Sequence, residues 1–131
     1  MYGNQHQEFG SLYEADMAAQ VAAASPHQLV VMLFSGLSDE LVRAKSHIQA
    51  QRYERKAQSI NKCIDILNAL TSALDYEKGG ELAENLARLY DYCVYRLYEA
   101  SHQLSCEGID EVETILNELR EGWEEMGKRH G

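Results

Sequence analysis

Apolar residues recur every three to four positions along most of this chain, a spacing typical of amphipathic helices. Four segments carry the repeat: Pro26 to about Gln51, about Glu54 to Tyr76, Leu82 to Leu104, and about Ile109 to Met126. Each is followed by a polar or glycine-containing break. The pattern therefore predicts four long helices and no strand.

The first of these helices has a well-marked start. Ser25 suits the N-cap, Pro26 suits the first helical position, where its missing N–H costs nothing, and Gln28 can reach back to complete a capping box. This is the only proline in the chain, so no later helix is interrupted by one. We expect a boundary between residues 25 and 26.

The breaks between the predicted helices are short. They fall at Ala50–Tyr53, at Lys78–Gly80 and at Cys106–Gly108. Connections of this length make consecutive helices antiparallel neighbours. The predicted fold is all-α, an antiparallel up-down four-helix bundle over residues 26–131.

The N-terminal residues 1–25 differ from the rest. Met1–Ser11 is polar and contains glycine, which predicts disorder, whereas Leu12–Ala24 is alanine-rich with apolar residues at helical spacing. We expect a flexible arm with a short capping helix. Such an arm can cover a groove or serve as a structural lid, and it can exchange between protomers at little cost.

Charge and composition narrow the classes of partner. The net charge is −9, from 21 acidic and 12 basic residues, so nucleic acid and anionic membranes would be repelled. The sequence shows neither a signal peptide nor a membrane span, and its three cysteines lack metal-site spacing. We expect a cytoplasmic protein with free, mostly buried thiols.

Candidate chemistry is sparse. Glu99 and His102 form a Glu-x-x-His, the spacing used by di-iron bundles, but those sites need two copies and only one occurs here. The sequence contains no phosphate-binding loop and no nucleophile elbow. We expect no enzyme, no cofactor and no metal, and chance accounts for the motif.

Apolar residues exceed what one narrow seam per helix would use. The surplus positions are Val30, Met32, Leu41, Ile66, Leu70, Tyr92, Tyr95 and Tyr98. A compact bundle that buries a wide stripe accounts for them, with tyrosine hydroxyls at the rim. A groove for an amphipathic partner helix is the alternative, which periodicity alone does not favour. Periodicity alone leaves both interpretations open.

Several short motifs occur in the order and at the spacing of a known family. They are Ala24–Leu29, Met32–Gly36, Glu77–Glu81, Asn85–Leu86, Leu89–Tyr92, Arg96–Leu97, Glu99–Ala100, Ile109–Val112 and Trp123. Together they resemble the flagellin export chaperones of the FliS family, from about Tyr13 to Met126. The chain departs from the family pattern at Ser35, Cys93 and Ser101, and Tyr13 is out of register with the family's arm tyrosine.

The resemblance implies a cytoplasmic chaperone, a monomer or weak dimer. Such a protein binds the C-terminal segment of flagellin, prevents its early polymerisation and delivers it to the flagellar type III export gate. The resemblance is also compatible with a flagellar regulatory protein as a further partner. The alternative is a helical adaptor or chaperone for another export substrate or regulator. The partner-binding residues we predict are Leu12, Tyr13, Leu29, Met32, Leu33, Leu37, Ile60, Ile64, Leu67, Leu70 and Tyr90.

Overall fold

The computed structural model describes residues 15–130, with side chains as far as residue 128, and this range is almost entirely helical. A short helix covers residues 15–23, which we call the arm helix. The long helices are α2 (Pro26–Gln49), α3 (Tyr53–Ser72), α4 (Tyr76–Gln103) and α5 (Cys106–His130). The predicted Leu12 and Tyr13 lie outside the described residues.

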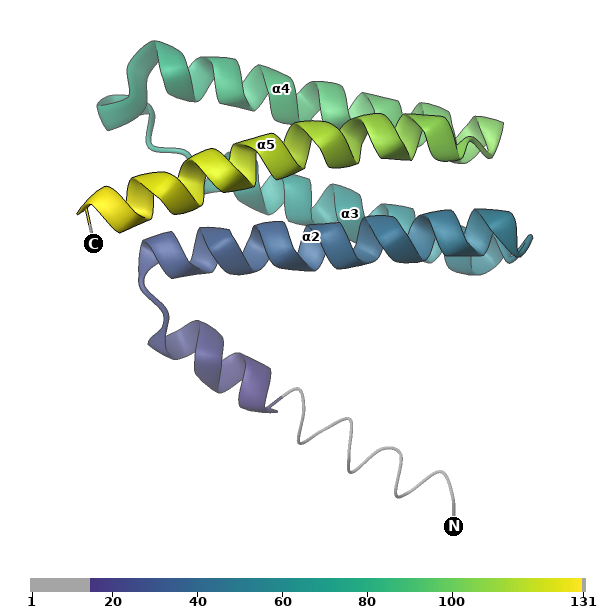
Figure 1. The fold of residues 1–131 in the computed structure, drawn as a ribbon, viewed down its shortest axis with the longest axis horizontal. Coiled ribbons are helices and arrows are strands. Elements are labelled where there is room, and N and C mark those ends of the chain that lie inside the picture. Colours follow the sequence, from purple (N-terminus) through teal and green to yellow (C-terminus); the bar gives the residue numbers. More distant parts are fainter. Residues whose placement is uncertain (1–14, 131) are drawn as a thin grey trace.

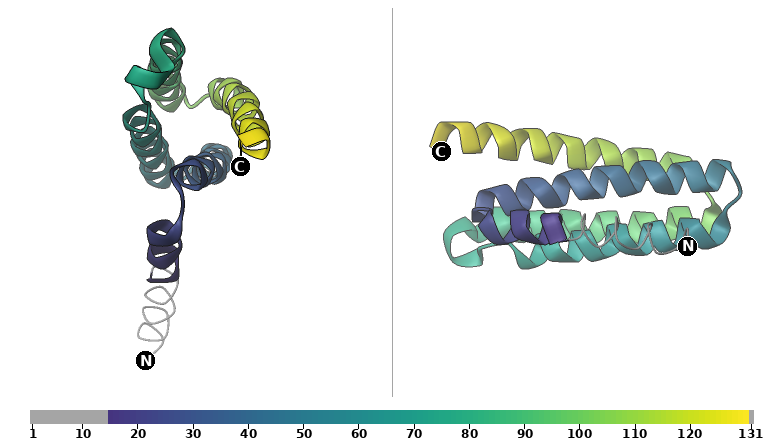
Figure 2. Two further views of the ribbon diagram at one scale, coloured as in Figure 1. Left: turned by 90° about the vertical axis from the view of Figure 1, so that its left-hand side faces the viewer. Right: turned by 90° about the horizontal axis from the view of Figure 1, so that it is seen from below.

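The four long helices form an antiparallel bundle (Figure 1). α2 packs against α3 and α5, and α4 packs against the same two helices, so the order around the bundle follows the chain (Figure 2). The arm helix lies outside the four-helix bundle, beside the first turns of α2. The predicted all-α up-down bundle is confirmed.

The start of α2 has the predicted capping box. The Gln28 backbone N–H donates to Ser25 Oγ at 3.1 Å, and the Ser25 N–H donates to Gln28 Oε1 at 2.8 Å. Pro26 occupies the first helical position. Local sequence alone therefore fixes where α2 begins.

The turn between α3 and α4 lies earlier than the predicted break at Lys78–Gly80. α3 ends at Ser72, not near Tyr76, because Asp75 caps a new helix by accepting the Lys78 N–H at 3.1 Å. The glycines lie inside α4, where Gly80 takes φ +50 and ψ −124 and kinks the helix. The apolar repeat does not reveal this turn, because Leu74 lies beyond the end of α3 and still packs against the core.

The reversal between α4 and α5 is also tighter than predicted. Leu104, at φ +55, ends α4 in the left-handed conformation, and α5 begins at Cys106 and not near Ile109. Gly108 is therefore helical. A Cβ at this position would lie 2.8 Å from the Ala100 Cβ, so glycine lets α5 approach α4 closely.

The core runs along the bundle axis and draws on all four long helices. Its fully buried side chains include Leu37, Leu41, Ile60, Leu67, Leu70, Leu97, Ile109 and Val112. Cys63 and Cys93 are free thiols within it, and burial raises the pKa of each to about 12. They therefore pack as small neutral side chains at neutral pH.

Ion pairs tie α5 to α2 and α4 near the α4–α5 turn. Lys45 contacts Asp110 at 2.8 Å and Glu113 at 2.9 Å, and hydrogen bonds to these carboxylates raise the pKa of Lys45. Arg96 Nε lies 2.8 Å from Glu111, which also accepts a hydrogen bond from the Tyr92 hydroxyl. We call Lys45, Tyr92, Arg96, Asp110, Glu111 and Glu113 the polar clasp.

Candidate functional site

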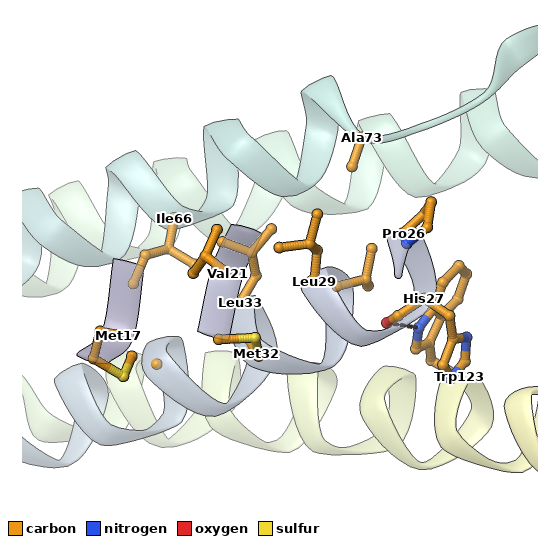
Figure 3. Close-up of a pocket in the computed structure, with 12 residues that line it drawn as sticks. Met17, Val21, Pro26, His27, Leu29, Met32, Leu33, Ile66, Ala73 and Trp123 are labelled. Carbon is orange, nitrogen blue, oxygen red and sulfur yellow. Dashed lines mark hydrogen bonds between the residues drawn. The ribbon is translucent and has the colours of Figure 1, made fainter. Parts of the chain in front are cut away.

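An apolar groove of about 750 Å³ opens at the opposite end of the bundle from the polar clasp. It lies between the arm helix, the first half of α2 and the last half of α3, with one residue of α5 at its end (Figure 3). Its lining residues are Met17, Val21, Pro26, His27, Leu29, Val30, Met32, Leu33, Gly36, Ile66, Ala73 and Trp123. Most of them are apolar side chains, which favours an apolar ligand.

The floor of the groove comes from α2 and α3. Leu29 and Leu33 lie one helical turn apart on α2, and both are half-buried. Gly36 continues the same side of the helix without a side chain, and a Cβ there would stand 3.8 Å from Ile66 Cδ1 on α3. This part of the floor therefore has no side chain from α2.

The arm helix forms one wall. Met17 and Val21, also one turn apart, line the groove together with Met32 and Leu33 (Figure 3). They remain 37% and 45% exposed, and every residue in 15–23 is exposed. A second hollow of about 460 Å³ lies between the arm helix and α2, lined in part by Gln20, Val31 and Met32. The arm helix is thus packed lightly.

An aromatic contact closes the far end. The rings of His27 and Trp123 are stacked with centroids 5.0 Å apart, and Trp123 Nε1 donates to the His27 carbonyl at 3.3 Å. A side chain on Gly127 would overlap the His27 imidazole, so the glycine gives the ring its space. This contact joins the end of α5 to the first turn of α2.

The groove lining is almost free of ionisable side chains. Among its lining residues only His27 carries a titratable side chain. Within the described part of the chain, no three His, Cys, Asp or Glu side chains gather to hold a metal ion. The Glu99 carboxylate instead contacts Arg96 and accepts from the Tyr95 hydroxyl at 3.2 Å. In the same range, no helix is long and apolar enough to span a membrane.

The predicted site residues divide into two groups. Leu29, Met32 and Leu33 meet in the groove. The other six described ones lie in the core, each at most 6% exposed: Leu37, Ile60, Ile64, Leu67, Leu70 and Tyr90. In this conformation they belong to the core and not to the groove lining, and direct contact between them and a partner stays a prediction.

The sequence did not indicate that several of the lining residues belong to one site. Val30 and Ile66 are among the surplus apolar positions, and Met17 and Val21 fall within the apolar repeat of Leu12–Ala24. The apolar repeat shows which residues share one face of a helix. It does not show which faces of α2, α3 and the arm helix meet, because the register in which α3 packs against α2 is not encoded in the repeat. His27 and Trp123 are separated by 96 residues and carried no signal of contact.

Comparison with known proteins gives one consistent result. A family model described as flagellar protein FliS matches residues 9–130. The flagellar secretion chaperone FliS of Salmonella typhimurium is 38% identical over 117 residues, covering 88% of this chain and 87% of that protein. The flagellar secretion chaperone FliSB of Pseudomonas aeruginosa is 39% identical over 111 residues, covering 85% and 88%. The Bacillus subtilis flagellar secretion chaperone FliS is 28% identical over 124 residues, covering 91% and 92%.

Proposed function

The chain belongs to the FliS family of flagellar secretion chaperones, and from that premise we propose that it binds the C-terminal segment of flagellin in the groove between the arm helix, α2 and α3. The observation that carries this proposal is the groove itself. It offers half-buried leucine, methionine and isoleucine side chains, and an apolar face of a partner helix is what such a surface accepts.

The chemical need of the substrate matches this surface. A flagellin tail that later packs into a filament core is apolar along one face and lacks a partner before assembly. A temporary groove shields that face and prevents early polymerisation. The loaded chaperone then presents flagellin to the flagellar export gate, and it acts in the cytoplasm, before export. We expect it to do so as a binding protein without enzymatic activity.

Titration calorimetry with a peptide of the last forty or so flagellin residues tests the proposal. We expect a one-to-one complex of roughly micromolar affinity or tighter, with the negative heat-capacity change of apolar burial. A well-folded protein that does not bind would favour the alternative, a helical adaptor or chaperone for another export substrate or a flagellar regulator.

A pair of charge substitutions locates the site. Met32→Glu places a carboxylate in the groove and should weaken binding at least tenfold. Leu82→Glu makes the same change at a residue that is 65% exposed on α4 and is not part of the groove lining, so affinity should be unchanged. Equal affinities for the two variants would place the peptide elsewhere on the bundle.

The arm is part of the same proposal. Residues 1–25 act as a separate cover for the 26–131 bundle, because the arm helix fills one wall of the groove and is exposed throughout residues 15–23. A cover lowers apparent affinity by the fraction of time for which it closes the groove. Removal of residues 1–21 should therefore raise flagellin affinity, and unchanged or weaker binding would disprove competition.

A further inference from the structure

Glu40 is a buried carboxylate that the packing of the bundle does not explain. The residue is 6% exposed, and its Oε2 atom meets no hydrogen-bond donor among the described residues. Oε1 accepts one hydrogen bond from Arg43 at 3.1 Å, but the Arg43 side chain is itself 59% exposed. Half of this carboxylate is therefore out of water without a partner.

The register of α2 and α3 places Glu40 just beyond one end of the groove. It follows Gly36, a groove-lining residue, by four positions and so lies on the same side of α2 one turn further on. Across the seam is Cys63, whose pKa is raised by burial and, to a lesser extent, by the charge of Glu40. Cys63 precedes Ile66, the α3 residue nearest Gly36, by one turn.

The stability of the bundle does not explain a carboxylate at position 40. A buried acceptor without a donor costs free energy, and an apolar side chain of similar size at such a site is often neutral or stabilising. The Arg43 side chain that contacts Glu40 is itself exposed to water, which weakens the ion pair. The residue is therefore better explained by a contact made only in the complex.

We propose that Glu40 determines specificity, by pairing with a lysine or arginine of the bound segment that follows the apolar residues filling the groove. The inference rests on the function proposed above. On binding, the partner's cation supplies the missing donor to Oε2. The apolar stretch from Leu29 to Gly36 followed by one acid would then fix the register of the bound chain.

The test compares two Glu40 variants with a matched control in the full-length protein. Glu40→Gln keeps the shape and removes the charge, Glu40→Met makes the site apolar, and Asp39→Asn removes one charge from the neighbouring exposed residue. Each is titrated with the same flagellin peptide, and its urea midpoint is measured. We expect both Glu40 variants to bind at least tenfold more weakly while their urea midpoints stay equal or rise. Asp39→Asn should change affinity less than about twofold.

A double-mutant cycle identifies the partner residue. Each lysine and arginine of the peptide is changed singly to methionine, and one change should weaken binding to the wild-type protein but not to Glu40→Met. If the wild type binds and both Glu40 variants bind equally well, the specificity proposal is wrong and the groove proposal stands. Loss of affinity that parallels a lower urea midpoint would also overturn it, as a purely structural effect. A wild type that does not bind the peptide would overturn both.

Discussion

The two ends of the bundle are built in opposite ways. At the clasp end, α5 is joined to α2 and α4 by ion pairs, and the side chains beneath, such as Leu97, Ile109 and Val112, are fully buried. At the groove end, Leu29, Leu33 and Ile66 are only half-buried, and α5 reaches the groove through Trp123. The four helices are thus tightly packed at the clasp end and leave apolar side chains partly exposed at the groove end.

This difference shows how a small bundle can be stable and still bind a chain. Side chains at the clasp end have already gained the free energy of leaving water, so they hold the fold and offer nothing to a partner. Side chains at the groove end keep apolar surface in contact with water. A ligand that covers this surface gains the burial that folding left incomplete.

The same substitution at the two ends should have unequal costs. Leu97→Ala removes a fully buried side chain at the clasp end and should lower the free energy of unfolding by about 2–5 kcal/mol. Leu33→Ala, in the half-buried groove, should cost about 1 kcal/mol because part of that side chain is already hydrated. Urea unfolding measures both. Equal losses would mean that the groove end is packed as tightly as the clasp end.

Two glycines of α5 test the aromatic contact that closes the groove. The new methyl group of Gly122→Ala meets no atom of the described residues within 4 Å, so this change should stabilise the protein by about 1 kcal/mol through helix propensity. At Gly127 the new methyl group would displace the His27 ring, so Gly127→Ala should lose the stack with Trp123 and gain nothing. We expect the two variants to differ by about 1–2 kcal/mol in thermal unfolding. Equal stabilisation would show that the stack contributes little.

At the groove end, the start of α2 is determined by the local sequence. Ser25→Ala removes the acceptor of the Gln28 N–H and should lower the free energy of unfolding by about 1 kcal/mol. Amide hydrogens in the first turn of α2 should then exchange faster. Ser35→Ala, at an exposed position inside the same helix, serves as the control and should not destabilise. If both variants behave alike, the capping box does not hold this end.

The polar clasp predicts a small effect of pH. Hydrogen bonds from Tyr92 and Arg96 lower the pKa of Glu111 below its ordinary value of 4.5. Stability from this residue is therefore present above that value and is lost as pH falls through the lower, folded-state pKa. As pH falls below 4.5, the wild type should lose stability more steeply than Glu111→Gln. Glu118→Gln, exposed on the same helix, should keep the wild-type slope.

Much of the fold could be predicted because its signals are local. The capping box at Ser25, the four apolar repeats and the short connections each depend on residues close in sequence. The end of α3 was placed too late for the same reason, since Leu74 continues the apolar repeat but Asp75 already caps the next helix. Local capping competes with periodicity there, and capping prevails.

The site was predicted only in part. Leu29, Met32 and Leu33 line the groove, whereas Leu37, Leu67 and the other core members of the predicted set do not. All of them share the apolar side of a helix. Whether a position on that side faces the core or the groove depends on the angle and register at which the neighbouring helix packs.

The sequence by itself determined the helices, their antiparallel order and the family, because these depend on local periodicity, capping and matching motifs. Only the tertiary structure decided which apolar residues stay open to water, that Trp123 closes the groove on His27, and that Glu40 is buried with one carboxylate oxygen that meets no donor among the described residues. These features arise between residues far apart in the chain. Their free energies depend on distances that no single helix contains.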